Sequence, residues 1–480
     1  MGNFRRVVVG LIFALGCQVQ GRNESATDAS VHLDTCSEPS VVCSGACVDL
    51  TSDEANCGQC GTACGATQFC KQGTCAKQAC GGEFPCPDGQ DCVNGSCVSP
   101  ADMTVVLAST PTVIACGANH TCALLASGGV MCWGANNSGQ LGNGTNTDSS
   151  VPVNVSGIST AIALSAGTTF SCAVLADGSV KCWGDNYYGE LGTGTNTSSN
   201  TPVSVTGVAS AAVAISSGNI TTCITLATGA VQCWGDNTNG EVGDGTNSGR
   251  SSATATSGIS SGAISTDVDG HGCAIVNGTL KCWGLNYFGE IGDGTKMNTR
   301  LTPVSVLNIS GPYATQSSPS QLVVTTGGWF SCVILSSGAV DCWGQNNVGQ
   351  LGNGGGSDST SPVAVTGLTS AVALTSAWYH ACALTSSGAV KCWGDNEKGQ
   401  VSSGAGATVS TATTVAGLGT PATSISAGGS EFAINSIGYT TGQSCAIVSG
   451  HVFCWGDNTF GQLGNGAKTS SATPVGVSGL

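Results

Sequence analysis

A repeated pair of cysteines constrains the fold of this chain more than any other feature. Seven times between residues 105 and 480, a cysteine is followed, after eight or nine residues, by Cys-Trp-Gly. The pairs are Cys122 and Cys132, Cys172 and Cys182, Cys223 and Cys233, Cys273 and Cys282, Cys332 and Cys342, Cys382 and Cys392, and Cys445 and Cys454. The tryptophans that follow lie 49 to 62 residues apart. A period in this range is typical of a propeller or a solenoid.

Each cysteine pair lies in a predicted β-hairpin. In the second repeat, two short apolar strands flank Ala176-Asp177-Gly178, a three-residue loop in which glycine can take the left-handed conformation. In the fourth repeat one residue is missing, and the loop becomes Asn277-Gly278, a strong signal for a two-residue hairpin. Both loops place the cysteines opposite each other, so we expect seven disulfides, one per hairpin. A metal site is a poor alternative because each hairpin offers only two thiolates.

The composition agrees with an all-β chain. Only 9% of the 480 residues are charged, whereas 73 are glycine, which leaves little material for amphipathic helices and favours short strands and tight turns. The net charge of −15 is the opposite of what nucleic-acid binding requires, so we expect no nucleic-acid partner. The 28 cysteines indicate an oxidising compartment and therefore export.

Residues 1–17 are predicted to be a signal peptide. Arg5 and Arg6 precede an apolar run that is too short to span a bilayer. The run ends in Ala14-Leu15-Gly16-Cys17, which resembles a bacterial lipoprotein signal with its leucine one place late. We therefore expect a lipid on Cys17 and a place at the outer membrane or cell surface, with no other membrane contact. Ordinary cleavage and release into the extracellular space is the alternative.

The next segments are predicted to carry the repeats away from that anchor. Residues 18–35 are polar and unpatterned, as expected of a flexible tether. Residues 36–97 hold twelve cysteines, a density typical of a small disulfide-rich module. Residues 47–64 resemble the cysteine-rich module of plant stigma-specific proteins and its relatives on bacterial surface proteins. Residues 98–104 are a predicted linker. Cys57 and Cys60 could be half of a zinc knuckle, but disulfides are the stronger expectation in an exported chain.

The segments that follow the repeat tryptophans identify the repeat. WGANNSGQLGNGT, WGDNYYGELGTGT and WGDNTFGQLGNG begin at Trp133, Trp183 and Trp455. Together with the hairpins, all seven repeats resemble those of the regulator of chromosome condensation family. Departures are mild: the third repeat reads GEVGDG, the sixth reads GQVSSG, and cysteines replace the usual apolar hairpin residues.

The resemblance implies a seven-bladed β-propeller with four-stranded blades over residues 105–480. The last repeat stops at about Val477, where other repeats continue into a further strand. We therefore expect residues 112–115 to supply that strand, so that the two ends of the repeat region share one blade.

The resemblance carries limited information about function. The founding member of the family exchanges nucleotide on a small GTPase and binds chromatin, but an exported, acidic chain meets neither partner, so exchange is not expected. A secreted β-lactamase inhibitory protein with a similar propeller, which caps an enzyme with aromatic loop residues, is a closer model. We expect a monomeric, non-catalytic protein-interaction platform without cofactor or metal. The alternatives are a secreted enzyme inhibitor, a glycan-binding propeller, and a lyase or hydrolase with an unrecognised site.

Aromatic residues mark the expected binding face. In an antiparallel hairpin, the loop entering the first strand and the loop leaving the second lie at the same end. The segments before each first cysteine and the variable pair after Trp-Gly-x-Asn therefore share one face. Exposed Trp and Tyr in loops are the usual anchors of an interface. We expect partner contact from Trp329, Trp378, Tyr379, Tyr187, Tyr188, Tyr287, Phe288 and Phe460. Phe330, in the same region, is expected to pack inward.

Other prominent residues have structural interpretations. The seven repeat tryptophans are expected to pack within the blades. His120, His271 and His380 occupy equivalent positions in blades that are not neighbours, which argues against a shared metal. Cys116 replaces a small residue and is expected to be a buried free thiol. Residues 258–262 match a nucleophile elbow, but they lack its strand-turn-helix context, and no other catalytic motif is visible.

Overall fold

The computed structural model divides the chain into two compact units, Met1–Val105 and Val106–Leu480. Of the second unit, the structure describes residues 109–309, 311–314, 322–434 and 437–480, with the side chains of 431–440 left out. Of the first unit it describes only the backbone of eight short strands. The predicted signal peptide with Cys17, the tether and residues 99–104 of the predicted linker lie outside the described residues, whereas Val98 ends a described strand.

The described strands of the first unit pair as four small hairpins. They are β1 (Ser40–Cys43) with β2 (Ala46–Asp49), β3 (Gln68–Lys71) with β4 (Thr74–Lys77), β5 (Ala79–Cys80) with β6 (Phe84–Pro85), and β7 (Asp91–Val93) with β8 (Ser96–Val98). The register places Cys70 opposite Cys75 and Cys92 opposite Cys97. The repeated cysteine spacing therefore gives the same local structure twice.

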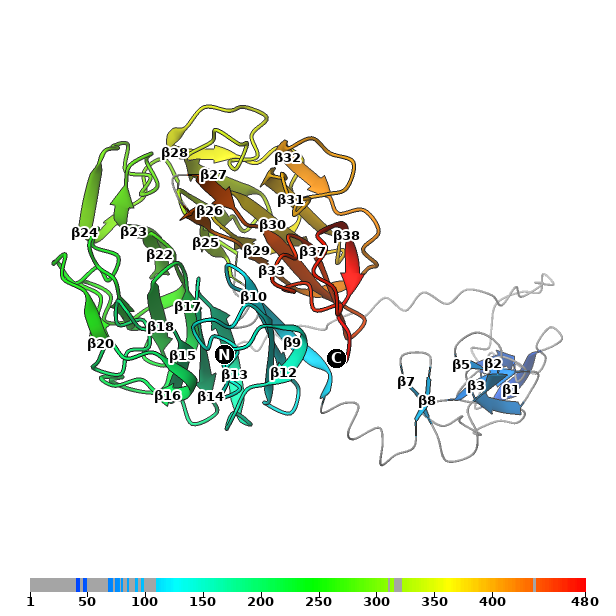
Figure 1. Ribbon diagram of the computed structural model, residues 1–480. Coiled ribbons are helices and arrows are strands. Elements are labelled where there is room, and N and C mark those ends of the chain that lie inside the picture. Colours follow the sequence, from blue (N-terminus) through cyan, green and yellow to red (C-terminus); the bar gives the residue numbers. More distant parts are fainter. Residues whose placement is uncertain are drawn as a thin grey trace, which may run out of the picture. The chain divides into compact units, whose positions relative to one another are not determined.

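The second unit is an all-β propeller of seven four-stranded antiparallel blades (Figure 1). Blade one consists of β9 (Pro111–Cys116), β10 (His120–Leu125), β11 (Val130–Gly134) and β12 (Ser149–Asn154), paired in chain order. The first strand of every blade lines a central channel, and the fourth lies at the rim. The predicted fold class is therefore confirmed.

The remaining blades repeat this arrangement in chain order. Blade two contains β13 (Ala161–Ala166), β14 (Phe170–Leu175), β15 (Val180–Gly184) and β16 (Ser199–Ser204); blade three β17 (Ala212–Ser217), β18 (Thr221–Leu226), β19 (Val231–Gly235) and β20 (Arg250–Ala255); and blade four β21 (Ala263–Val268), β22 (His271–Val276), β23 (Thr279–Asn286) and β24 (Asn298–Ser305). Blade five contains β25 (Val324–Thr326), β26 (Phe330–Ile334), β27 (Val340–Gly344) and β28 (Ser359–Ala364); and blade six β29 (Ala371–Ser376), β30 (His380–Thr385), β31 (Val390–Asp395) and β32 (Thr408–Thr414). Blade seven contains β33 (Ala422–Gly428), β36 (Gln443–Val448), β37 (His451–Gly456) and β38 (Ser471–Gly476), with the hairpin β34 (Glu431–Ile434) and β35 (Ile437–Thr440) inserted after its first strand.

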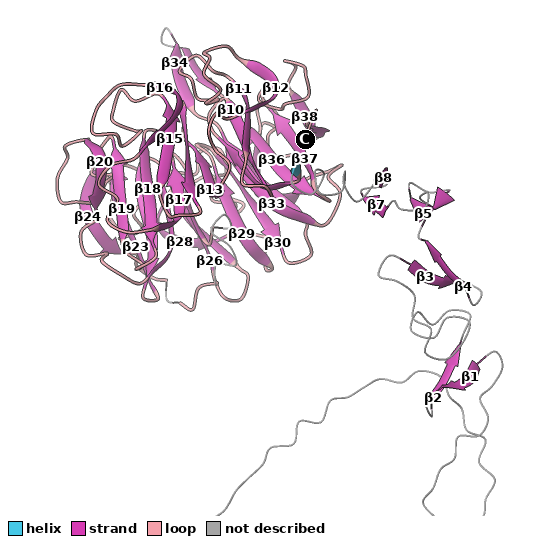
Figure 2. Ribbon diagram, turned by 90° about the horizontal axis from the view of Figure 1, so that it is seen from below, coloured by secondary structure: helices cyan, strands magenta, loops and turns pink. Residues whose placement is uncertain are grey.

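Burial explains why the middle strands read as continuous apolar runs rather than alternating ones. Strands such as β14 and β22 are buried along nearly their whole length, because a neighbouring blade covers each face of the sheet. The rim strands are partly exposed and rich in Ser and Thr. Strands and loops make up nearly all of the described propeller (Figure 2). In this described part, no helix is long and apolar enough to cross a membrane.

The structure joins the seven predicted cysteine pairs as disulfides, one across the central hairpin of each blade. The paired Cα atoms lie 4.0–4.1 Å apart, and every one of these cysteines is buried. Each bond closes a loop of about ten residues, worth up to about 3 kcal/mol in the chain-entropy estimate. The hairpin loops are also as predicted: Gly178 is left-handed (φ 80°), and so are both Asn277 and Gly278.

The repeat tryptophans connect neighbouring blades by hydrogen bonds as well as by packing. All seven are fully buried, and each indole N–H donates to a backbone carbonyl of the preceding blade at 2.7–2.9 Å. The acceptor is the carbonyl of the Gln or Glu in the Gly-Gln/Glu-Leu-Gly segment, for example Gln140 for Trp183. The bond from Trp133 to Gln462 closes the ring between blades one and seven.

The expected shared blade is wrong. Residues 112–115 belong to β9, which pairs with β10 inside blade one, and blade seven has its own first strand, β33. The error arose because the recognisable repeat begins at the hairpin, whereas the structural blade begins one strand earlier. Blades one and seven lie side by side (Figure 1). They meet through contacts such as the Cys116 N–H, which donates to Ser426 Oγ at 2.9 Å.

We predict that Cys116 is the single propeller cysteine that a thiol reagent labels in the unreduced protein after denaturation, because the other fourteen are disulfide-bonded. Peptide mass spectrometry of the alkylated full-length chain measures this directly. Without denaturant, Cys116 should remain unlabelled, since it is buried. Labelling at several of the fourteen hairpin cysteines in unreduced protein would contradict the disulfide pattern.

Candidate functional site

One end of the blades carries the long connections between third and fourth strands, and we call it the loop face. It is formed by the connections between first and second strands, such as residues 327–329, and by those between third and fourth strands, such as residues 287–297. Both connections lie at the same end, because the first and third strands of an antiparallel blade run in the same direction. The short loops of the disulfide hairpins lie at the opposite end.

Five aromatic side chains form a continuous row across this face, which we call the aromatic ridge. Its members are Tyr287 and Phe288 of blade four, Trp329 of blade five, and Trp378 and Tyr379 of blade six. Successive ring centroids lie 4.9 Å (Tyr287 to Phe288), 5.4 Å (Phe288 to Trp329), 5.8 Å (Trp329 to Trp378) and 6.2 Å (Trp378 to Tyr379) apart. All these contacts are edge-to-face, the geometry that aromatic quadrupoles favour. The ridge therefore joins three consecutive blades.

The other predicted face residues lie apart from the ridge. Tyr187 and Tyr188 form their own edge-to-face pair on blade two, with centroids 4.9 Å apart, and Tyr187 is the more exposed of the two at 72%. Phe460 occupies the equivalent loop of blade seven and is half-buried. Phe330 is fully buried and belongs to the core. Sequence reasoning thus placed these residues on one face but could not tell which of them touch.

A buried polar framework holds the loops beneath the ridge. In every repeat the Asn of Trp-Gly-x-Asn accepts a hydrogen bond from the backbone N–H five residues later, as Asn286 does from Ile291 at 3.1 Å. The following Gln or Glu turns back and accepts from the backbone N–H two residues earlier, as Glu290 does from Phe288 at 2.8 Å. These side chains are buried, so they fix the backbone that presents the aromatic rings. Their recurrence at fixed spacing identified the repeat in the sequence, but it did not reveal that these side chains bond to the loop backbone.

Burial changes the ionisation of the acidic members of this framework. Desolvation raises the pKa of Glu190 and of Glu290 to about 7 in each case, and it also raises the pKa of Glu241. The charge of Asp185 adds to the effect at Glu190. Four other blades carry Gln at this position: Gln140, Gln350, Gln400 and Gln462.

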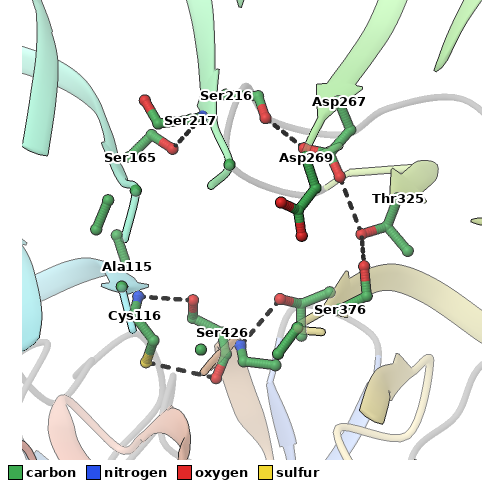
Figure 3. A pocket seen from close by; sticks show the side chains of 18 of the residues that line it. Ala115, Cys116, Ser165, Ser216, Ser217, Asp267, Asp269, Thr325, Ser376 and Ser426 are labelled. Atoms are coloured by element: carbon green, nitrogen blue, oxygen red, sulfur yellow. Dashed lines mark hydrogen bonds between the residues drawn. The ribbon is translucent and has the colours of Figure 1, made fainter. Parts of the chain in front are cut away.

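The central channel contains a cavity of about 120 Å³, lined by the first strand of every blade (Figure 3). Its wall is rich in hydroxyl groups, including those of Ser165, Ser217 and Ser376. Cys116 lies in this wall, and burial raises the pKa of its thiol to about 12, so the thiol is neutral and poorly nucleophilic at ordinary pH. Two acidic residues, Asp267 and Asp269, also line the cavity.

The three equivalent histidines are internal links between blades. His120, His271 and His380 place Nε2 at 2.8, 2.6 and 3.0 Å from a serine hydroxyl of the next blade. Burial lowers their pKa values to about 4, 3 and 4, so they are neutral at physiological pH. Within the described residues, no group of three or more His, Cys, Asp or Glu side chains is arranged to hold a metal ion.

The family follows from this fold and this repeat. The family model of the RCC1-like domain matches residues 104–434, and that of the Regulator of chromosome condensation (RCC1) repeat matches residues 449–480. The chain therefore belongs to the RCC1-like propeller family. No curated protein sequence matches it.

Solved structures share the fold at low sequence identity. Human WBSCR16 is 21% identical over 67% of this chain and 85% of its own, with a TM-score of 0.58. Yeast RCC1 (Prp20) bound to Kap60 is 17% identical over 77% of this chain and 85% of its own, with a TM-score of 0.60. Prp20p of Saccharomyces cerevisiae, a structure described with its binding properties to Gsp1p and histones, is 16% identical over 78% of this chain and 88% of its own, with a TM-score of 0.59. Identities this low establish the shared fold alone.

We predict that Glu190→Gln stabilises the propeller at about pH 8. Because burial raises the folded-state pKa of Glu190 to about 7 from 4.5, the folded protein binds more protons than the unfolded chain between these values. This contribution to the free energy of unfolding therefore falls as pH rises from about 4.5 to 7 and stays low above 7. Glutamine removes that loss, on the order of 2 kcal/mol. Urea unfolding as a function of pH measures it.

The blades supply a matched control for this prediction. In blade six, Gln400 Nε2 donates to Asp395 at 2.8 Å, and Asp185 occupies the equivalent place in blade two. Glu190→Gln should therefore recreate an existing pair, whereas Gln400→Glu should destabilise the protein above pH 7. If Glu190→Gln leaves the pH profile unchanged, Glu190 is already ionised at neutral pH in the folded state.

Proposed function

We propose that the propeller is a non-catalytic, monomeric protein-binding platform, and that its partner contacts the loop face at the aromatic ridge. The observation that carries this proposal is the row of five aromatic rings that joins blades four, five and six. Tyr287 is 47% exposed, and the other four rings are half-buried. The ridge therefore offers large apolar surface to a partner from an already ordered position.

Ordered aromatic surface is well suited to binding a protein. Trp and Tyr are the residues most enriched among interface hot spots, and they lose little side-chain entropy on binding when neighbours already hold them. The ridge rings meet at interplanar angles of 64–89°, so they do not form one flat stacking surface of the kind that a sugar chain uses. This favours a protein partner over a glycan.

We further propose that the platform works outside the cytosol, attached to a cell surface by a lipid on Cys17. Seven buried disulfides support an oxidising compartment, because a reducing cytosol disfavours them. In chain order, the predicted tether and disulfide-rich module would then follow the anchor and precede the propeller. Binding to Gsp1p and histones belongs to yeast Prp20p and is not carried over to this chain, with which it shares only the fold.

We predict that the triple variant Trp329→Ala, Trp378→Ala, Tyr379→Ala loses the protein partner that the unaltered chain captures. The expected loss is at least tenfold, since two or three aromatic anchors of this kind each contribute about 1–3 kcal/mol. Quantitative affinity capture from the surface and secreted fractions of the source organism, followed by mass spectrometry, compares the two baits. The captured protein is then purified and its affinity is measured for both.

A matched control separates the ridge from general surface effects. Tyr187 and Tyr188 lie on the same face but outside the ridge, so the variant Tyr187→Ala, Tyr188→Ala removes two exposed aromatic side chains without changing the ridge. It should retain the partner if the ridge is the site. Equal retention by the ridge variant would refute the proposal, and capture of glycoproteins that is lost after deglycosylation would favour glycan binding.

We predict that Cys17→Ser moves the protein from the membrane fraction to the soluble fraction, because a lipid on Cys17 is the membrane contact that the sequence indicates. Fractionation and mass spectrometry of the mature N-terminus measure the change. Lipid-modified Cys17 should be detected in the unaltered protein. Unchanged membrane association of the variant would contradict anchoring at this residue.

A further inference from the structure

Asp269 stands at a position where the other blades carry almost no side chain. The first strands end at seven equivalent residues, which are Gly117, Gly167, Gly218, Asp269, Gly327, Ala377 and Gly428. In six blades the backbone N–H of this residue donates to the carbonyl of the residue that opens the second strand, as Gly167 does to Phe170 and Asp269 does to His271. Blade four alone places a carboxylate in this ring.

Close backbone packing explains why the other blades use small residues here. A Cβ atom added to Gly167 would lie 2.6 Å from the carbonyl oxygen of Gly218, and one added to Gly428 would lie 2.2 Å from that of Gly117. Blade four, which carries Asp269 here, has a connection of two residues, where blade two has three. Its departure from the repeat therefore involves both a shorter loop and a charged residue.

The carboxylate of Asp269 is only partly satisfied by the protein. One oxygen accepts a hydrogen bond from the Asn219 backbone N–H at 2.9 Å. Among the described residues, none donates to the other oxygen. Asp269 is only 7% exposed, and Figure 3 shows its carboxylate directed into the cavity.

Asp267, two residues earlier, differs in this respect. It accepts hydrogen bonds from the hydroxyl of Ser216, from the hydroxyl of Thr325 at 3.1 Å, and from both the backbone N–H and the hydroxyl of Thr326. Asp267 therefore links blades three, four and five and is a structural residue. Asp269 makes a single such contact, to the Asn219 backbone of blade three, and five of the other six blades have glycine at this position. A buried carboxylate is costly unless something pairs with it.

An aromatic face borders the same cavity. Trp378 of blade six is among its lining residues, and its indole lies over Gly328 of blade five, where an added Cβ would be only 2.7 Å from the ring. Gly327 and Gly328, which lie between Asp269 and Trp378 in blade order, contribute no side chain. The end of the channel at the loop face, which we call the channel mouth, thus combines the carboxylate of Asp269 with the indole of Trp378.

We propose that this mouth binds an arginine side chain of the partner protein, with Asp269 as the counter-ion and Trp378 as the stacking surface. This inference rests on the proposed function and names the chemistry that the partner presents. Guanidinium suits the site better than ammonium, because it is planar, stacks on indole and is weakly hydrated. Its several N–H donors also match the hydroxyl and carboxylate acceptors of the wall.

The surrounding charges favour a cation from outside. The residues that line the cavity include neither lysine nor arginine in the described part of the chain. Arg250 and Arg300, in the outer part of the propeller, are already paired with Asp244 and Asp293. Overall the chain has a net charge of −15, so its field attracts a basic partner.

The titratable groups that line the cavity set the pH dependence of this site. They are Cys116, Asp267 and Asp269 in the described residues. Burial raises the pKa of Asp269 to about 7, with a contribution from Asp267, while Cys116 remains neutral. Asp269 is therefore ionised above about pH 7, and arginine binding strengthens as pH rises through this value.

Calorimetric titration of the full-length protein with the peptide acetyl-Gly-Arg-Gly-amide tests the proposal at about pH 8. The matched probe replaces arginine by citrulline, which keeps the shape but removes the charge. We expect the arginine peptide to bind at least about tenfold more tightly than the citrulline peptide, and more weakly at about pH 5.5. Asp269→Asn and Trp378→Ala should each lower the affinity for the arginine peptide.

The controls keep the two proposals distinguishable. Asp177→Asn makes the same charge change in a hairpin loop at the opposite end and should leave binding intact. Asp269→Gly restores the residue that five other blades carry, so it serves as a second variant if Asp269→Asn folds poorly. Absence of arginine-peptide binding at millimolar concentration, or equal binding by the Asp269 variants, overturns the cation site. A partner that the ridge variant loses but Asp269→Asn retains leaves the proposed function standing without it.

Discussion

The hydrogen bond from each buried tryptophan to the preceding blade is the interaction on which the propeller depends. A blade buries its apolar faces only against its two neighbours, so the ring is stable only if every blade-to-blade contact keeps the same register. The indole N–H sets that register, because it reaches one particular carbonyl in each neighbour. Leaving such a buried carbonyl unpaired costs about 1–3 kcal/mol. In most blades, the glycine two residues after the acceptor, such as Gly142 after Gln140, leaves room for the indole of the next blade.

Disulfides complement this bond by acting inside the blades. The chain has few large apolar residues for its size, and many buried positions hold Ala, Ser or Thr. A core of small side chains buries less apolar area, and the hairpin disulfides offset this by restricting the unfolded chain. Tryptophan therefore defines how blades meet, while the cysteines strengthen each blade. The disulfides lie outside the loops, and the tryptophan bond uses only the carbonyl of one Gln or Glu in each long loop, so other loop positions differ between blades.

Local signals in the sequence predicted most of the fold. The hairpins, their loop types and the cysteine pairing all depend on residues within about ten positions of one another. The prediction that the two ends of the repeat region share one blade was wrong. It depends on where a blade begins, and the repeat motif does not mark that boundary. The site was predicted only in part: strand connectivity placed the aromatic residues on one face, but the contact between Phe288 and Trp329 joins different blades. Asp269 was missed, although aligning the seven repeats places it in a column of glycine and alanine.

That column indicates how function is distributed over such a repeat. Where a residue serves the fold, all seven blades need it, and the same side chain recurs, as with the tryptophans and the loop asparagines. Where a residue serves a ligand, one or a few blades differ from the rest. Such a difference is tolerated only if other interactions offset the stability that it removes from the fold. Asp269, Trp329 and Trp378 differ from the equivalent residues of most other blades, as the proposed binding role requires. They lie on consecutive blades at the same end of the channel, which is why binding is expected there rather than at the more uniform opposite end.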